Sequence, residues 1–147
     1  MRKKMNDKGF TLVELIVVLV ILAILAAILV PALLGYIDRA KTQQHVLDGK
    51  SILTAAQAEA SSMYAQDKDP KDMPAQRVAN TADVPGTATI GFKATYTAGK
   101  HDSYVVYYVA YKYGTGAGDV IYFDGSTWTE TNPGGTPNNP VSIPEHE

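Results

Sequence analysis

Three aspartates near the middle of the chain are spaced closely enough to bind a metal ion together. Asp67, Asp69 and Asp72 follow the pattern D-x-D-x-x-D within a stretch that contains several prolines. Clustered carboxylate oxygens are ligands that Ca²⁺ prefers, so these residues are weak candidates for a calcium site. The stretch lacks the glycine and the final glutamate of an EF-hand loop, and Lys68 and Lys71 alternate with the acids. A solvated loop is therefore the favoured interpretation.

The other reactive residue types do not form a catalytic pattern. His45, His101 and His146 lie far apart in the sequence, and we expect solvated histidines. Gly114–Gly118 reads G-T-G-A-G without the following lysine and serine or threonine of a phosphate-binding loop, which predicts a turn. The chain has no cysteine, which excludes a disulfide, a thiolate metal site and a cysteine nucleophile. We therefore expect neither an enzyme nor a cofactor.

Charge is distributed unevenly along the 147 residues, although the net charge is only −2. Residues 1–9 contain four basic side chains and one acidic one. Residues 10–147 contain nine basic and 14 acidic side chains, a side-chain net charge of −5. This balance excludes a strongly basic nucleic-acid binder, and no specific nucleic acid is inferred.

One long apolar run follows the basic leader. Leu15–Ile37 contains 23 residues without a charge, and as a helix it would be about 35 Å long, enough to cross a hydrocarbon core of about 30 Å. The preceding basic residues predict a cytoplasmic N-terminus and an external C-terminal part. A cleaved secretory signal and a plain anchor are the alternatives. The run is longer than the apolar core of a secretory signal and is not followed by an obvious A-x-A cleavage site. A plain anchor does not explain Glu14, because a carboxylate in a membrane helix costs about 2.5–3.5 kcal/mol.

The second half of this helix is predicted to be amphipathic, from Tyr36 to about Tyr64. Its apolar stripe, at helical spacing, consists of Val46, Gly49, Leu53, Ala56, Ala60 and Met63. A coiled coil is the rival interpretation, but two heptads are too few to support it. Gln66–Thr89, with its prolines, is predicted to be a long connection.

Alternating apolar residues after this connection predict a small antiparallel meander of three or four strands. The expected strands are Thr89–Thr97, Ser103–Tyr113, Asp119–Phe123 and Thr127–Thr131. The tail from Pro133 contains four prolines, so we expect it to be extended or flexible. Seven of the nine tyrosines lie between Tyr96 and Tyr122. Such a concentration of tyrosines is typical of a half-exposed sheet. Electron conduction and ligand stacking are alternative roles for these tyrosines.

The segment K-G-F-T-L-V-E-L at Lys8–Leu15, together with the leader, the apolar run and Pro31, resembles the class III signal of type IV pilins and pseudopilins. The resemblance covers about the first 35 residues. It implies an α+β, pilin-like fold in which a long N-terminal helix packs against the meander. In having no cysteine, the chain resembles pilins of Gram-positive bacteria, because Gram-negative relatives commonly close the head with a disulfide.

The resemblance assigns roles to four residues. Prepilin peptidase would cut after Gly9 and methylate the new N-terminus at Phe10, with S-adenosylmethionine as the methyl donor. Glu14 would pair with the Phe10 amine of a neighbouring subunit and fix the axial register of a growing filament. An intrachain pair and a snorkelling carboxylate are the alternatives. Pro31 predicts a kink, because it lacks the N–H that would bond the Ala27 carbonyl.

The sequence thus predicts a structural subunit of a type IV pilus, with a leader (1–9), a transmembrane and filament-core helix (10–37) and a head (38–147). The expected partners are further copies of the chain, prepilin peptidase, an assembly ATPase and a platform membrane protein. The protein would span the cytoplasmic membrane once and then move into an extracellular pilus. The alternative is a major pseudopilin of a type II secretion or competence DNA-uptake pseudopilus. A surface-anchored enzyme or binding module is a third class.

Overall fold

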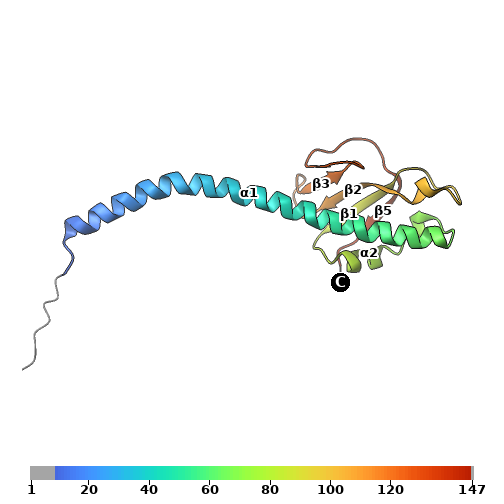
Figure 1. Cartoon of the computed structure of the whole chain (residues 1–147), viewed down its shortest axis with the longest axis horizontal. Helices are drawn as coiled ribbons and strands as arrows, with labels where there is room; N and C mark the ends of the chain where they lie inside the picture. The colour runs from blue at the N-terminus through green and yellow to red at the C-terminus, as the bar shows by residue number, and fades with distance from the viewer. Residues whose placement is uncertain (1–8, 147) are drawn as a thin grey trace, which may run out of the picture. The chain divides into compact units, whose positions relative to one another are not determined.

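The computed structural model describes residues 9–146, so residues 1–8 of the predicted leader lie outside the described residues. The described residues form an α+β fold with a long N-terminal helix and an antiparallel sheet, which confirms the predicted fold class (Figure 1). In chain order the elements are α1 (Leu12–Ala65), the 3₁₀ turn η1 (Pro70–Asp72), α2 (Ala75–Ala82), β1 (Thr87–Phe92), the 3₁₀ turn η2 (His101–Tyr104), β2 (Val106–Lys112), β3 (Val120–Phe123), β4 (Trp128–Thr129) and β5 (Asn138–Ile143).

The chain divides into two compact units. The first ends at Lys41 and contains the apolar half of α1. The second unit, Thr42–Glu147, contains the other half of α1 and every strand among the described residues, and we call it the head. The predicted boundaries at residues 9 and 37 stay predictions.

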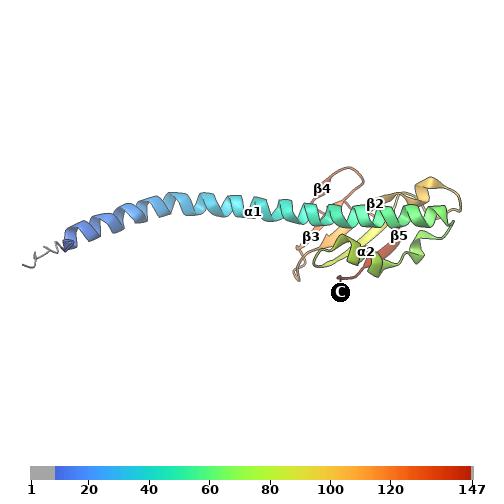
Figure 2. The same cartoon turned by 60° about the horizontal axis from the view of Figure 1, so that its bottom comes forward.

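The half of α1 that belongs to the head buries one face against the sheet. Its buried residues are Gly49, Ile52, Ala55, Ala56, Ala60 and Met63. Four of the six predicted stripe residues are therefore buried. Val46 and Leu53 are only partly buried, and Ile52 is buried in their place with 2% of its surface exposed. Small side chains on this face let the helix lie close to the strands, beside β1 and β2 in Figure 1 and beside β2 in Figure 2.

Two contacts fix α1 on the sheet. The Gln57 side chain donates a hydrogen bond to the carbonyl of Tyr104 at 3.0 Å and accepts one from the amide of Val106 at 2.9 Å. At Gly49 the ring of Trp128 lies so close that a Cβ atom would approach its Cζ3 at 2.5 Å. Glycine is required there because any side chain would displace the ring.

The sheet has five strands in the order β4-β3-β2-β1-β5, and all paired neighbours are antiparallel. Strands β1 to β4 form the predicted meander. The predicted count of three or four is too low because the tail, expected to be flexible, supplies β5. Val141 and Ile143 of β5 pair with Ile90 and Ala88 of β1 and are buried. Pro140 is tolerated because β5 is an edge strand, where a missing N–H leaves no ladder partner unsatisfied.

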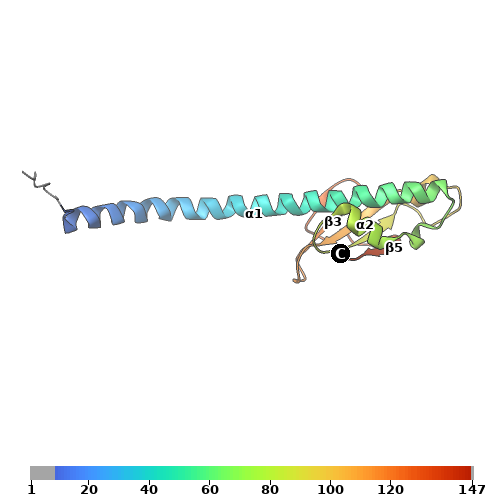
Figure 3. The same cartoon turned by 90° about the horizontal axis from the view of Figure 1, so that it is seen from below.

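The segment predicted as a long connection is more structured than expected. It contains η1 and the two-turn helix α2, which lies next to the head half of α1 in Figures 1 and 3. Pro74 stands just before α2, where a missing N–H costs little, and Val78 and Ala79 are buried. Prolines were interpreted as breakers, whereas here one of them precedes a helix.

Candidate functional site

The Gly9–Phe10 bond, the predicted cleavage site, lies just before the first turn of α1. Residues 9–11 have no regular secondary structure, and α1 begins at Leu12. Phe10 is 89% exposed, and among the described residues, apart from the direct chain neighbours of Gly9, no atom lies within 4 Å of the position that a side chain on Gly9 would take. A peptidase needs an accessible bond outside regular secondary structure, and the Gly9–Phe10 bond lies in such a segment. Cleavage after Gly9 stays a prediction.

Glu14 forms a capping box with Thr11 at the start of α1. The Glu14 Oε2 atom accepts hydrogen bonds from the backbone N–H and from the hydroxyl of Thr11, both at 2.8 Å. The Thr11 hydroxyl oxygen in turn accepts from the backbone N–H of Glu14 at 3.3 Å. Two N–H groups that have no partner inside the helix are thereby satisfied. Within one chain, the Glu14 carboxylate is therefore bound by Thr11.

The capping box is a feature that the sequence interpretation missed. Its signal was present, because Thr-x-x-Glu before an apolar run is the pattern of such a box. The sequence interpretation considered the cost of the Glu14 carboxylate in lipid and its pairing with a neighbouring Phe10 amine, but not its role as a helix cap.

The apolar half of α1 leaves its side chains uncovered. Every large apolar residue from Leu12 to Ile37 keeps at least 40% of its surface exposed. By length and composition, α1 could cross a membrane. So much exposed apolar surface requires lipid or other apolar helices around it.

Pro31 lies inside α1, which is assigned as helix without interruption from Leu12 to Ala65. The Pro31 nitrogen cannot donate to the Ala27 carbonyl, so this turn has one hydrogen bond fewer than its neighbours. The predicted kink stays a prediction.

Two of the three candidate calcium ligands, Asp67 and Asp69, make structural contacts, and the third, Asp72, is exposed. Asp69 caps η1 by accepting from the Lys71 amide at 3.0 Å and pairs with the Lys71 ammonium at 3.1 Å. Asp67 accepts from the Gly99 amide at 3.1 Å. Within residues 9–146 no group of three or more histidine, aspartate or glutamate side chains is placed to hold a metal ion.

Histidine and tyrosine side chains take up structural positions. His45 is half-buried and stacks on Tyr113 with ring centroids 3.6 Å apart, so the prediction of a solvated side chain was wrong for it. Tyr104 and Tyr111 are buried, and burial is the main reason why the pKa of each is raised to about 12. The Tyr111 hydroxyl donates to the Pro85 carbonyl. These two tyrosines belong to the core and not to the half-exposed surface that was expected.

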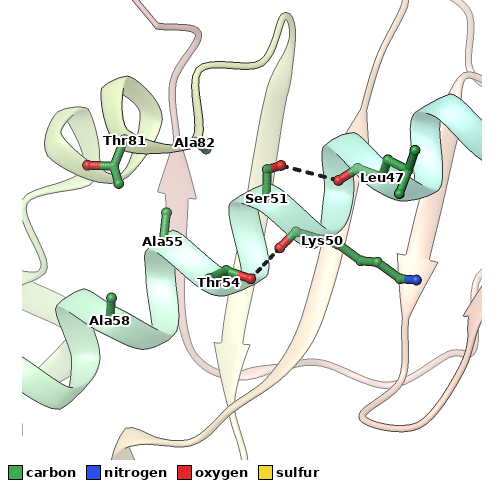
Figure 4. Close-up of a pocket in the computed structure, with 8 residues that line it drawn as sticks. All are labelled: Leu47, Lys50, Ser51, Thr54, Ala55, Ala58, Thr81 and Ala82. Atoms are coloured by element: carbon green, nitrogen blue, oxygen red, sulfur yellow. Dashed lines mark hydrogen bonds between the residues drawn. The ribbon is translucent and has the colours of Figure 1, made fainter.

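A surface hollow of about 490 Å³ lies between α1 and α2 in the head. Figure 4 shows the residues that line it. Short side chains line it, and the hydroxyls of Ser51 and Thr54 donate back to the carbonyls of Leu47 and Lys50. Lys50 is the one charged residue that lines the hollow, so its lining offers no acid–base pair.

The comparisons with known proteins concern the N-terminal end of the chain. The family model described as the prokaryotic N-terminal methylation motif matches residues 4–30. No curated protein and no solved structure matches the chain. The matched range contains the Gly9–Phe10 bond, Glu14 and most of the apolar run. At its N-terminus the chain is therefore similar to type IV pilin-like proteins, including pseudopilins, and the motif implies processing by prepilin peptidase.

Proposed function

We propose that the chain is a structural subunit of a type IV pilus. Prepilin peptidase removes residues 1–9 and methylates Phe10. The apolar half of α1 holds the subunit in the cytoplasmic membrane with its head outside. An assembly ATPase and a platform membrane protein then move it into the filament. The methylation motif at residues 4–30 supports the first step, and it also fits membrane anchoring before assembly.

The observation that carries this proposal is the uncovered apolar surface of residues 12–37 beside a single carboxylate. A lipid anchor needs the apolar surface but not Glu14. A bundle of identical helices needs both the apolar surface and Glu14. Apolar side chains exclude water from the bundle, but they do not fix the position of each helix along the bundle axis. A charge in such a bundle allows only those positions that bring a counter-charge to it.

Cleavage supplies the counter-charge. It creates an amine at Phe10 close to the positive end of α1, where a cation is unfavourable without a nearby anion. The Glu14 carboxylate is bound to Thr11 by one of its oxygens, Oε2. We therefore propose that the remaining lone pairs of Glu14 accept from the Phe10 amine of a neighbouring subunit.

Mass spectrometry of surface filaments tests the proposal. The subunit should begin at Phe10 with an N-methyl group, and a strain without this chain should lack the filaments. Filaments that carry an intact residue 1, or that persist without the chain, would refute the proposal. Filaments confined to the cell envelope would instead assign the chain to a pseudopilus.

Two substitutions at Glu14 separate helix capping from charge. Glu14→Gln keeps an acceptor oxygen for the capping box but removes the charge, whereas Glu14→Leu removes both. Both should be inserted and cleaved, and both should accumulate as monomer in the membrane. Asp38→Asn, on the same helix, is the matched control and should assemble normally. Normal filaments from Glu14→Gln would show that capping, and not charge, is the contribution of Glu14.

A further inference from the structure

The face of the sheet that points away from α1 carries a row of residues of unequal size. Thr89 of β1 pairs with Ala110 of β2, which also pairs with Tyr122 of β3. Side chains alternate along a strand, so these three point away from the core side, where the buried Ile90 and Val109 lie. The small Ala110 therefore leaves a gap between larger neighbours.

A chain segment crosses this outer face. Because β4 and β5 are at opposite edges of the sheet, residues 130–137 connect one edge to the other. Asn132 and Pro137 of this segment line a hollow together with residues of β1, β2 and β3. At the end of this crossing, Pro137 lies against Gly91, where any Cβ would collide with the proline ring. The crossing segment and the sheet together form an open hollow of about 340 Å³ with Ala110 as part of its lining.

The lining of this hollow combines aromatic rings, hydroxyls, an amide and one ammonium group. Tyr108 and Tyr122 provide the rings, Thr87 and Thr89 the hydroxyls, and Asn132 of the crossing segment the amide. Lys112 is the one charged residue in the lining, within a head that is acidic as a whole. Burial is the main reason why the pKa of Tyr108 is raised, so its hydroxyl remains a neutral donor at physiological pH.

A sugar ring matches these groups. Its C–H face packs against tyrosine rings, and its hydroxyls bond to threonine and asparagine side chains. The lone ammonium selects for an anion, because an acidic head would otherwise repel one. We propose that this hollow binds a hexuronate unit of an acidic polysaccharide, with the ring on Tyr108 and Tyr122 and the carboxylate on Lys112.

The test uses the full-length chain as monomer in detergent micelles, so its result does not depend on filament assembly. Trigalacturonic acid is the probe and neutral galactotriose is the comparison. Saturation-transfer NMR and calorimetric titration measure binding. The acidic trisaccharide should bind more tightly than the neutral one. Absence of binding by the acidic sugar, or equal binding of both sugars, would overturn the proposal.

Four variants locate the site. Ala110→Leu fills the hollow and should abolish binding, and Tyr122→Ala should weaken it about tenfold. Lys112→Gln should weaken acidic-sugar binding about fivefold and leave neutral-sugar binding unchanged. Lys50→Gln, an exposed lysine on α1, is the matched control and should bind like the unaltered chain. An equal loss in Lys50→Gln and Lys112→Gln would show non-specific attraction and overturn the proposal.

The variants must also be shown to fold. Trp128 is the single tryptophan and lies against Gly49 in the core-side contact between β4 and α1. Its emission spectrum should therefore be the same in all four variants. If Ala110→Leu keeps this emission and still binds the acidic sugar, the hollow is not the site.

Discussion

Among single residues, Thr11 and Glu14 combine a capping box at the start of α1 with the proposed contact between subunits. Glu14 would be costly in lipid if it were unpartnered, and the capping box provides two hydrogen bonds within the same chain. The box thus makes the carboxylate tolerable before a second subunit is present. Its remaining lone pairs stay free for the proposed contact between subunits.

Thr11→Val should fray the start of α1. Valine keeps the backbone N–H that donates to Glu14 but lacks the hydroxyl that makes the other two bonds. Loss of a capping side chain costs about 1 kcal/mol. Hydrogen exchange of the amides at residues 12–15, measured in detergent, should become faster. Thr11→Ser keeps the hydroxyl and should restore slow exchange; equal rates in Thr11→Val and the unaltered chain would contradict the capping box.

Asp124 predicts an acid-sensitive turn in the hairpin between β3 and β4. Its carboxylate accepts from the Thr127 amide at 2.8 Å, from the Ser126 hydroxyl at 2.8 Å and from the Ser126 amide at 2.9 Å. These bonds, with that of Thr127 the strongest, lower the pKa of Asp124 from 3.8 to about 2. A folded-state pKa below the unfolded one stabilises the fold above about pH 4 and loses this effect as pH falls towards 2.

Urea unfolding between pH 5 and pH 2 checks this prediction. The midpoint of the unaltered chain should fall with pH, and Asp124→Asn should remove part of that dependence because asparagine carries no charge. Asp72→Asn is the matched control, because Asp72 is exposed. An NMR titration that gives Asp124 an ordinary pKa would refute the prediction.

At the scale of elements, opposite faces of the same helical segment differ sharply in burial. Ile52 is 2% exposed in the core, whereas Leu47 on the other face is 56% exposed. Removing a buried side chain loses its transfer free energy and leaves a cavity, while removing an exposed one loses little. Leu53, which was predicted to belong to the buried apolar stripe, is only partly buried beside a surface hollow.

Ile52→Ala should therefore lower the free energy of unfolding by about 2–5 kcal/mol. Leu47→Ala, the matched control, should change it by no more than about 0.5 kcal/mol. We expect Leu53→Asp to fall between these two because its side chain can reach solvent. Urea unfolding followed by Trp128 emission measures all three. A larger loss in Leu47→Ala than in Ile52→Ala would mean that the other helix face is buried.

At the scale of the whole molecule, the two compact units differ in how their apolar side chains are covered. Every buried apolar residue of the core lies between Ile52 and Ile143, within the head. The uncovered apolar surface of residues 12–37 belongs to the first unit. The head thus has its own core, whereas the first unit depends on lipid or on other subunits.

A fragment that begins at Thr42 should accordingly fold in aqueous buffer without detergent. It should unfold in a single cooperative transition, with the Trp128 emission of the full chain, because Trp128 and its contacts with Gly49 and Phe123 lie within the fragment. A fragment that begins at Ser61, and so lacks Ile52, Ala56 and Ala60, is the control and should not fold. A non-cooperative transition in the longer fragment would show that the head needs the first unit.

The features that depend on neighbouring residues along the chain could be predicted from the sequence. The basic leader, the uncharged run and the Thr11–Glu14 spacing lie within a few turns of one another. The helical spacing of Gly49, Ala56 and Ala60 likewise predicts one buried face from neighbouring turns alone.

The features that need partners far away in the sequence depend on strand order, and they could not be predicted from local patterns. Asn138–Ile143, with Pro140 inside it, looks like a tail until the free edge of β1 offers it hydrogen bonds. The hollow at Ala110 exists because residues 130–137 must cross the sheet to reach that edge. No sequence pattern around Ala110 or Asn132 predicts the hollow, because strand order, and not spacing along the chain, brings these two residues together.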